Sequence, residues 1–107
     1  MKYLFVDTDG TLELREQAAE LKLKEMQDWV GGLIELTSNS IPRKGVEELL
    51  KVFGIPDFFS EDDGEWVRIQ MIIGEEARLQ RLTRNNVASS LRGFEILGNV
   101  IIIKGEL

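Results

Sequence analysis

The fold of this chain is decided first by residues 2–16, which read KYLFVDTDGTLELRE. Residues 2–6 are almost continuously apolar, which is typical of a strand that is covered on both faces. Asp9-Gly10 is a strong signal for a two-residue hairpin turn. Residues 11–16 then alternate between polar and apolar side chains, as a half-buried strand does. We therefore predict that the chain opens with a β-hairpin.

After the hairpin, the spacing of apolar residues changes between helical and strand-like periods. Three glycines are expected to end helical stretches: Gly31, where a left-handed C-terminal residue is expected, Gly54 and Gly93. Ser40 is placed to cap a further helix that carries Pro42 in its first turn. The first predicted helix ends at Gly31, and the other two cover 41–53 and 84–92. The later strands cover 33–37, 66–73 and 99–104.

These elements follow one another in the order ββαβ(α)βαβ, with the helix at 41–53 in parentheses. The opening hairpin excludes a purely parallel sheet. We therefore expect residues 1–107 to form a single compact α+β domain with a mixed sheet of about five strands. Two to three helices should pack largely on one face, and the strand at 99–104 should be central.

Composition excludes several classes of function. The chain has 107 residues, of which 43% are hydrophobic and 30% charged, with no cysteine and no histidine. This excludes disulfides, thiolate nucleophiles, Cys- or His-based zinc sites and Ser-His-Asp triads. No apolar run approaches the roughly 20 residues needed to span a bilayer, so we expect a cytoplasmic protein without a membrane partner.

The net charge of −6 is unevenly distributed along the chain. Residues 1–65 carry 7 basic and 15 acidic side chains, whereas residues 66–107 carry 6 basic and 4 acidic ones. An acidic protein is a poor general binder of nucleic acids, because their binding depends on neutralising phosphates. The acidic half either serves solubility or forms a face for a basic partner.

The run Asp7-Thr8-Asp9-Gly10-Thr11, after an apolar strand, resembles the nucleophile motif of the haloacid-dehalogenase phosphohydrolases. That resemblance implies a Mg²⁺-dependent phosphohydrolase, with Asp7 attacking phosphorus and Asp9 acting as acid and base. Further residues match later motifs of the family superficially, namely Thr37 or Ser38 after the next strand and the pair Asp62-Asp63.

The remainder of the phosphohydrolase pattern fails. The acidic pair at 62–63 follows no strand of usable length, and the stretch from Ser40 to Asp62 is too short for the family's lysine motif and crossover helices. Asp9-Gly10 followed by an alternating segment also meets the requirements of a tight hairpin without any catalytic role. We interpret the likeness as coincidental and retain Asp7 and Asp9 as an alternative catalytic pair.

A second resemblance covers most of the chain. Residues 23–35, LKEMQDWVGGLIE, the helix at 85–91, NNVASSL, and the closing strand entered by Gly98-Asn99 are similar to a family of small domains of unknown function. Such domains occur in phages, plasmids and prokaryotic chromosomes. The resemblance implies a fold but no activity, and the helix at 41–53 departs from the pattern as an insertion.

Two groups of residues are candidates for binding. Phe58, Phe59 and Trp66 flank the acidic pair Asp62-Asp63; if exposed they form an interface, and if buried they anchor the loop. Arg78, Arg81 and Arg84 recur every three residues before a helix start, either as a small-anion or nucleotide site or as a solvated basic edge.

Our leading interpretation is a small non-enzymatic accessory domain that acts through contact with an unknown protein partner, with a homodimer kept open. We predict no cofactor and no metal site. The alternatives are phosphohydrolysis at Asp7 and Asp9 and anion binding at the three arginines.

Overall fold

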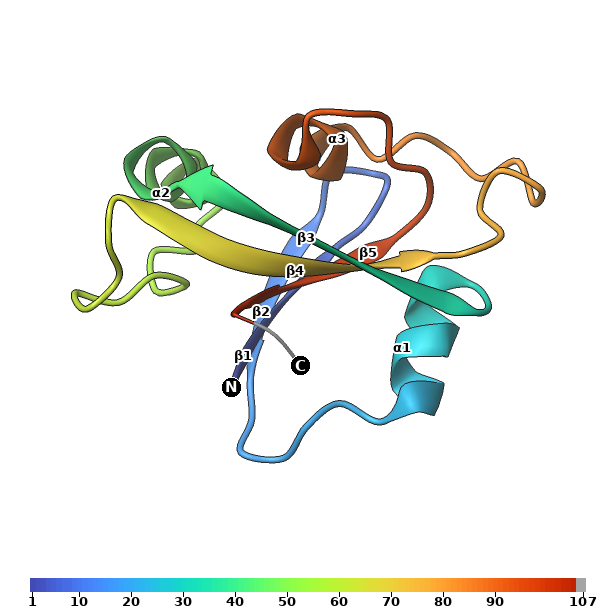
Figure 1. The fold of residues 1–107 in the computed structure, drawn as a ribbon, viewed down its shortest axis with the longest axis horizontal. Coiled ribbons are helices and arrows are strands. Elements are labelled where there is room, and N and C mark those ends of the chain that lie inside the picture. The colour runs from blue at the N-terminus through green and yellow to red at the C-terminus, as the bar shows by residue number, and fades with distance from the viewer. Residues whose placement is uncertain (106–107) are drawn as a thin grey trace.

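The structure is a computed structural model that describes residues 1–105, and within them the chain forms five strands and three helices (Figure 1). In chain order these are β1 (Lys2–Val6), β2 (Leu12–Glu16), α1 (Leu23–Val30), β3 (Ile34–Pro42), α2 (Arg43–Val52), β4 (Trp66–Gly74), α3 (Asn86–Arg92) and β5 (Val100–Lys104). The order confirms the predicted compact α+β class, including the helix that the sequence places at 41–53.

The five strands form one sheet in the order β2-β1-β5-β4-β3, with β5 central as predicted. Every neighbouring pair is antiparallel, so the prediction of a mixed sheet is wrong. A mixed sheet would require a helix that joins two neighbouring parallel strands. Here α1 leads from β2 at one edge of the sheet to β3 at the other edge. α2 and α3 do join neighbouring strands, but those strands run antiparallel.

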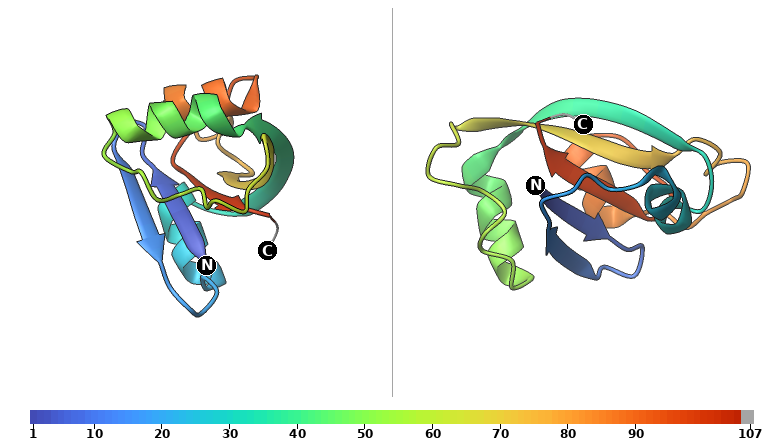
Figure 2. Two further views of the ribbon diagram at one scale, coloured as in Figure 1. Left: turned by 90° about the vertical axis from the view of Figure 1, so that its left-hand side faces the viewer. Right: turned by 90° about the horizontal axis from the view of Figure 1, so that it is seen from below.

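Helices cover both faces of the sheet (Figures 1 and 2). α2 and α3 share one face, where Val46, Leu50 and Ala88 join the apolar side chains of the inner strands, and α1 covers the other face with Met26 and Val30. The expectation that helices lie largely on one face thus holds for two of the three. β1 and β5 are apolar on both sides, and such strands need cover on both faces.

The hairpin between β1 and β2 forms as predicted, but its loop is longer than two residues. Val6 pairs with Leu12, and inside that pair the Asp7 N–H donates to the Thr11 carbonyl while the Gly10 N–H donates to the Asp7 carbonyl. This is the pattern of a three-residue loop in which the last residue is left-handed. Gly10 occupies that position with φ 91°.

Helix ends follow the sequence signals at Gly31 and Gly93, which both have φ 89° and donate to the last turn of their helices. The start of α2 does not follow the sequence signal at Ser40. Ser40 lies inside β3 and caps nothing, because β4 offers paired backbone as far as Pro42 and the side chain of Ile41 is buried there. α2 therefore begins at Arg43 without a side-chain cap.

No helix within residues 1–105 has the length and apolar character needed to cross a membrane.

Candidate interaction surface

The acidic loop, defined here as residues 53–65, connects α2 to β4 and is anchored by two aromatic side chains. Phe58 and Phe59 are 1% and 7% exposed, and their rings meet edge to face with centroids 5.2 Å apart. Both belong to the core beneath α2. They therefore hold the loop and present no surface to a partner, which leaves Trp66 as the exposed aromatic residue of the predicted interface.

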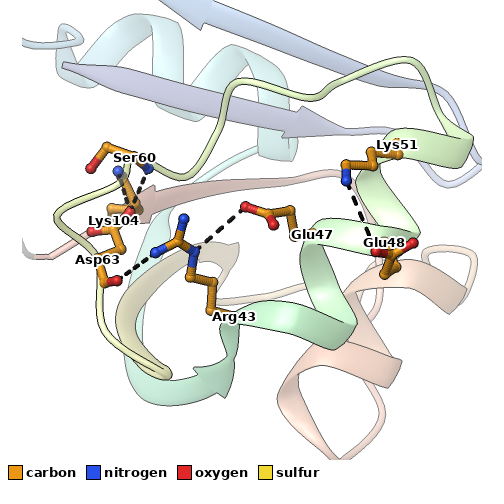
Figure 3. Close-up of polar contacts among 7 residues, drawn as sticks. All are labelled: Arg43, Glu47, Glu48, Lys51, Ser60, Asp63 and Lys104. Atoms are coloured by element: carbon orange, nitrogen blue, oxygen red, sulfur yellow. Dashed lines mark hydrogen bonds and ion pairs between the residues drawn. The ribbon is translucent and has the colours of Figure 1, made fainter.

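Asp63 ties the acidic loop to the end of the sheet (Figure 3). Its Oδ2 accepts hydrogen bonds from the Lys104 ammonium at 2.8 Å and from the Ser60 N–H at 2.8 Å. Partial burial by itself raises the pKa of Asp63, but the hydrogen bonds from Lys104 and Ser60 outweigh it and hold the pKa below its usual value. Its neighbour Asp62 is exposed.

Arg43 ties the same loop to the start of α2 (Figure 3). Its side chain donates to the Asp63 carbonyl and lies 3.5 Å from the Glu47 carboxylate, and its backbone N–H donates to the Glu65 carbonyl at 2.8 Å. An exposed Glu48–Lys51 ion pair at 3.9 Å lies further along α2. The loop is thus held at Asp63 by the side chains of Lys104 and Arg43, and not only by its ends.

A cavity of about 570 Å³ lies between the start of α2 and the acidic loop. Trp66 stands beside it with 67% of its surface exposed. The remaining lining residues include both signs of charge and are Pro42, Arg43, Lys44, Glu47, Asp63, Gly64 and Glu65. We call this region the Trp66 surface. It can present an aromatic ring and several charged groups on a fixed framework.

Asp7 and Asp9 lie in the hairpin loop, and their carboxylates accept hydrogen bonds from its backbone. The Asp7 carboxylate accepts the Asp9 N–H at 3.1 Å, and the Asp9 carboxylate accepts the Thr11 N–H at 2.8 Å. The hydrogen bonds from Thr11 hold the pKa of Asp9 below its usual value. Short polar side chains commonly hydrogen-bond to backbone two residues ahead in this way to form turns.

The structure does not bring the other residues of the phosphohydrolase motif to Asp7. Asp63 contacts Lys104, which lies beside the first residue of β1, whereas Asp7 follows the last residue of β1, about 17 Å further along the strand. Thr37 lies on β3, from which β1 is separated by β4 and β5. Within residues 1–105, no group of three or more acidic side chains is arranged to hold a metal ion.

The three arginines of the predicted anion site do not line one common cavity. Arg78 lines a cavity of about 330 Å³, and its guanidinium lies 3.5 Å from Glu95. Glu35 and Glu75 line the same cavity as Arg78 and Glu95, so the net charge of its lining is negative. Arg81 and Arg84 do not line it.

Sequence reasoning missed the role of Asn85, which is fully buried before α3. Its Nδ2 donates to the carbonyls of Val6 at 3.1 Å and Gly98 at 3.0 Å, and its Oδ1 accepts the Ala88 N–H at 3.0 Å. One side chain thus joins the end of β1, the segment before β5 and the start of α3. The signal in the sequence was an asparagine at a helix start, which predicts a cap but not the other two bonds.

Comparisons of this chain with protein-family models, with curated proteins and with solved structures yield no significant match.

Proposed function

We propose that this chain is a small non-enzymatic accessory domain that acts through protein–protein contact, and that the Trp66 surface makes that contact. One observation carries the proposal. Trp66 opens the inner strand β4 and is nevertheless 67% exposed beside a cavity. Tryptophan is highly buried on average, and it is enriched among the residues that contribute most to the free energy of binding in interfaces.

The framework around Trp66 favours such a role. Hydrogen bonds hold the acidic loop to α2 through Arg43 and to β5 through Asp63 and Lys104. The loop is therefore ordered without a bound partner. A surface that is already ordered loses less conformational entropy on binding. The Trp66 surface is therefore suited to stable contact.

The charges of the surface favour a protein over a polyanion. The cavity is lined by two basic residues, Arg43 and Lys44, and by three acidic ones, Glu47, Asp63 and Glu65. Nucleic acids are held by surfaces that neutralise phosphates with an excess of basic groups. A mixed rim around an exposed aromatic residue is the usual composition of a protein interface.

The test compares the wild-type chain with Trp66→Ala and a matched control, Val52→Ala, in pull-downs from native lysate. Val52 is 82% exposed but lies on α2 away from the cavity lining. We expect the wild-type chain and Val52→Ala to retain the same stoichiometric partner and Trp66→Ala to lose it, with all three melting at similar temperatures. Equal retention by Trp66→Ala, or no stoichiometric partner for the wild type, would count against the proposal.

A further inference from the structure

Among residues 1–105, none pairs with the outer edge of β3. Within that range the nine-residue strand pairs only with β4 and is the outermost element on its side of the sheet (Figure 2). An unpaired edge presents backbone N–H and C=O groups that can pair with another strand. The edge of β3 is therefore a second surface, separate from the Trp66 surface.

Hydrogen bonds beyond the ends of β3 show which of its residues point outward. The Glu75 N–H donates to the Leu33 carbonyl, and the Arg43 N–H donates to the Glu65 carbonyl, both at 2.8 Å. Bonded and non-bonded pairs alternate along an antiparallel ladder. The odd-numbered residues therefore bond to β4, and the outward N–H and C=O groups belong to Ile34, Leu36, Ser38 and Ser40. Pro42, at the end of the strand, has no N–H.

The two edges of the sheet differ in how they are protected. Natural edge strands usually avoid further pairing by being short or by carrying charged side chains. β2, at the other edge, has five residues and contains Glu13, Arg15 and Glu16. β3 is almost twice as long and carries one charged residue, Glu35, with Leu36 45% exposed beside it. β2 has the properties of a protected edge, and β3 does not.

We propose that β3 pairs antiparallel with β3 of a second copy of this chain, about a two-fold axis at Thr37. In this register Leu36 faces Ser38 of the second copy and Ile34 faces its Ser40, so all four outward residues of each strand form backbone pairs. The ladder ends before Pro42 on both sides. The product is one continuous ten-stranded sheet, whose two outer edges are the charged β2 strands.

The side chains are compatible with this register. Thr37 faces its own symmetry mate, and its hydroxyl, which accepts a hydrogen bond from Arg92 Nε at 2.9 Å, keeps its own proton to donate across the axis. Glu35 faces Asn39, so the two Glu35 carboxylates lie four residues apart along the strand, about 13 Å. A self-complementary patch of this kind is what a closed two-fold dimer requires.

The first test measures mass by analytical ultracentrifugation over a wide range of chain concentrations. We expect the wild type to reach twice the 12.2 kDa of one chain. Leu36→Lys and Ser38→Pro should remain monomeric, because they place a charge on the edge or remove an outward N–H without touching a bond to β4. Val52→Lys, the matched control, should dimerise as the wild type does, and so should Trp66→Ala, which separates this proposal from the proposed function.

The second test uses the absence of cysteine from the chain to fix the register. Residues that face each other in a non-bonded antiparallel pair have Cα atoms about 4.5 Å apart, a distance that a disulfide can span. Thr37→Cys should therefore form a covalent dimer on mild oxidation, and Glu35→Cys should not. A wild-type chain that is monomeric at millimolar concentration, or equal cross-linking of the two variants, would overturn the proposal. Monomeric chain is also the result expected if β3 instead receives an extended peptide from another protein.

Discussion

Replacing Asn85 by alanine should be among the most destabilising single changes in this chain. The side chain is fully buried and makes three hydrogen bonds to backbone groups of three separate segments. Alanine would leave the carbonyls of Val6 and Gly98 and the N–H of Ala88 without that partner. At about 1 to 2 kcal/mol for each of these three buried groups left unpaired, the loss in free energy of unfolding is about 3 to 6 kcal/mol. Domains of this size have free energies of unfolding of about 5–15 kcal/mol, so much of the stability would be lost.

Urea unfolding followed by circular dichroism measures this loss, with Asn86→Ala as the matched control. Asn86 is the first residue of α3, is exposed, and its change to alanine should alter the free energy of unfolding by no more than about 0.5 kcal/mol. Asn85→Asp keeps the acceptor for Ala88 but removes both donors, so it should also destabilise strongly. Asn85→Ala could instead lower the free energy of unfolding by less than about 1 kcal/mol, with the dependence on urea concentration unchanged. That result would refute the reasoning, because three unpaired buried groups would then cost less than one is expected to cost.

Two further predictions concern the acidic loop. Because the native pKa of Asp63 lies below its usual value, its contribution to stability should be complete above about pH 4 and lost as the pH falls through the native pKa. Asp63→Asn should therefore lower the free energy of unfolding by about 1–2 kcal/mol at pH 6, and the difference from wild type should shrink towards pH 2; a difference independent of pH would contradict this. Phe58→Ala should cost about 3–5 kcal/mol, clearly more than Phe53→Ala, whose side chain is 38% exposed. Similar losses for the two phenylalanine variants in thermal melts would mean that Phe58 does not anchor the loop.

Local features of the fold could be predicted from sequence because nearby residues determine them. The hairpin, the glycine ends of α1 and α3 and the apolar central strand all follow from patterns within about ten residues. The length of the hairpin loop did not follow, because Asp9-Gly10 suits both two- and three-residue loops. The backbone bonds between Asp7 and Thr11 select the longer one.

Features that depend on distant partners could not be predicted. Ser40 has the properties of a helix cap, yet it lies in β3 because β4 provides a paired strand as far as Pro42. The sequence allowed Phe58 and Phe59 to be either an anchor or an exposed patch, and only the position of α2 above them decides for the anchor. The exposure of Trp66 could not be predicted either, because it depends on the path of the acidic loop beside it.

The sequence alone determined the α+β class, the order of most elements and the absence of cysteine and histidine chemistry, because periodicity and composition are local properties of the chain. The tertiary structure alone decided the antiparallel order of the strands, the separation of Asp7 from the pair Asp62-Asp63 and the open edge of β3. Those features depend on which strands become neighbours, and that choice is made by burial of both faces of β1 and β5 between helices that come from distant parts of the chain.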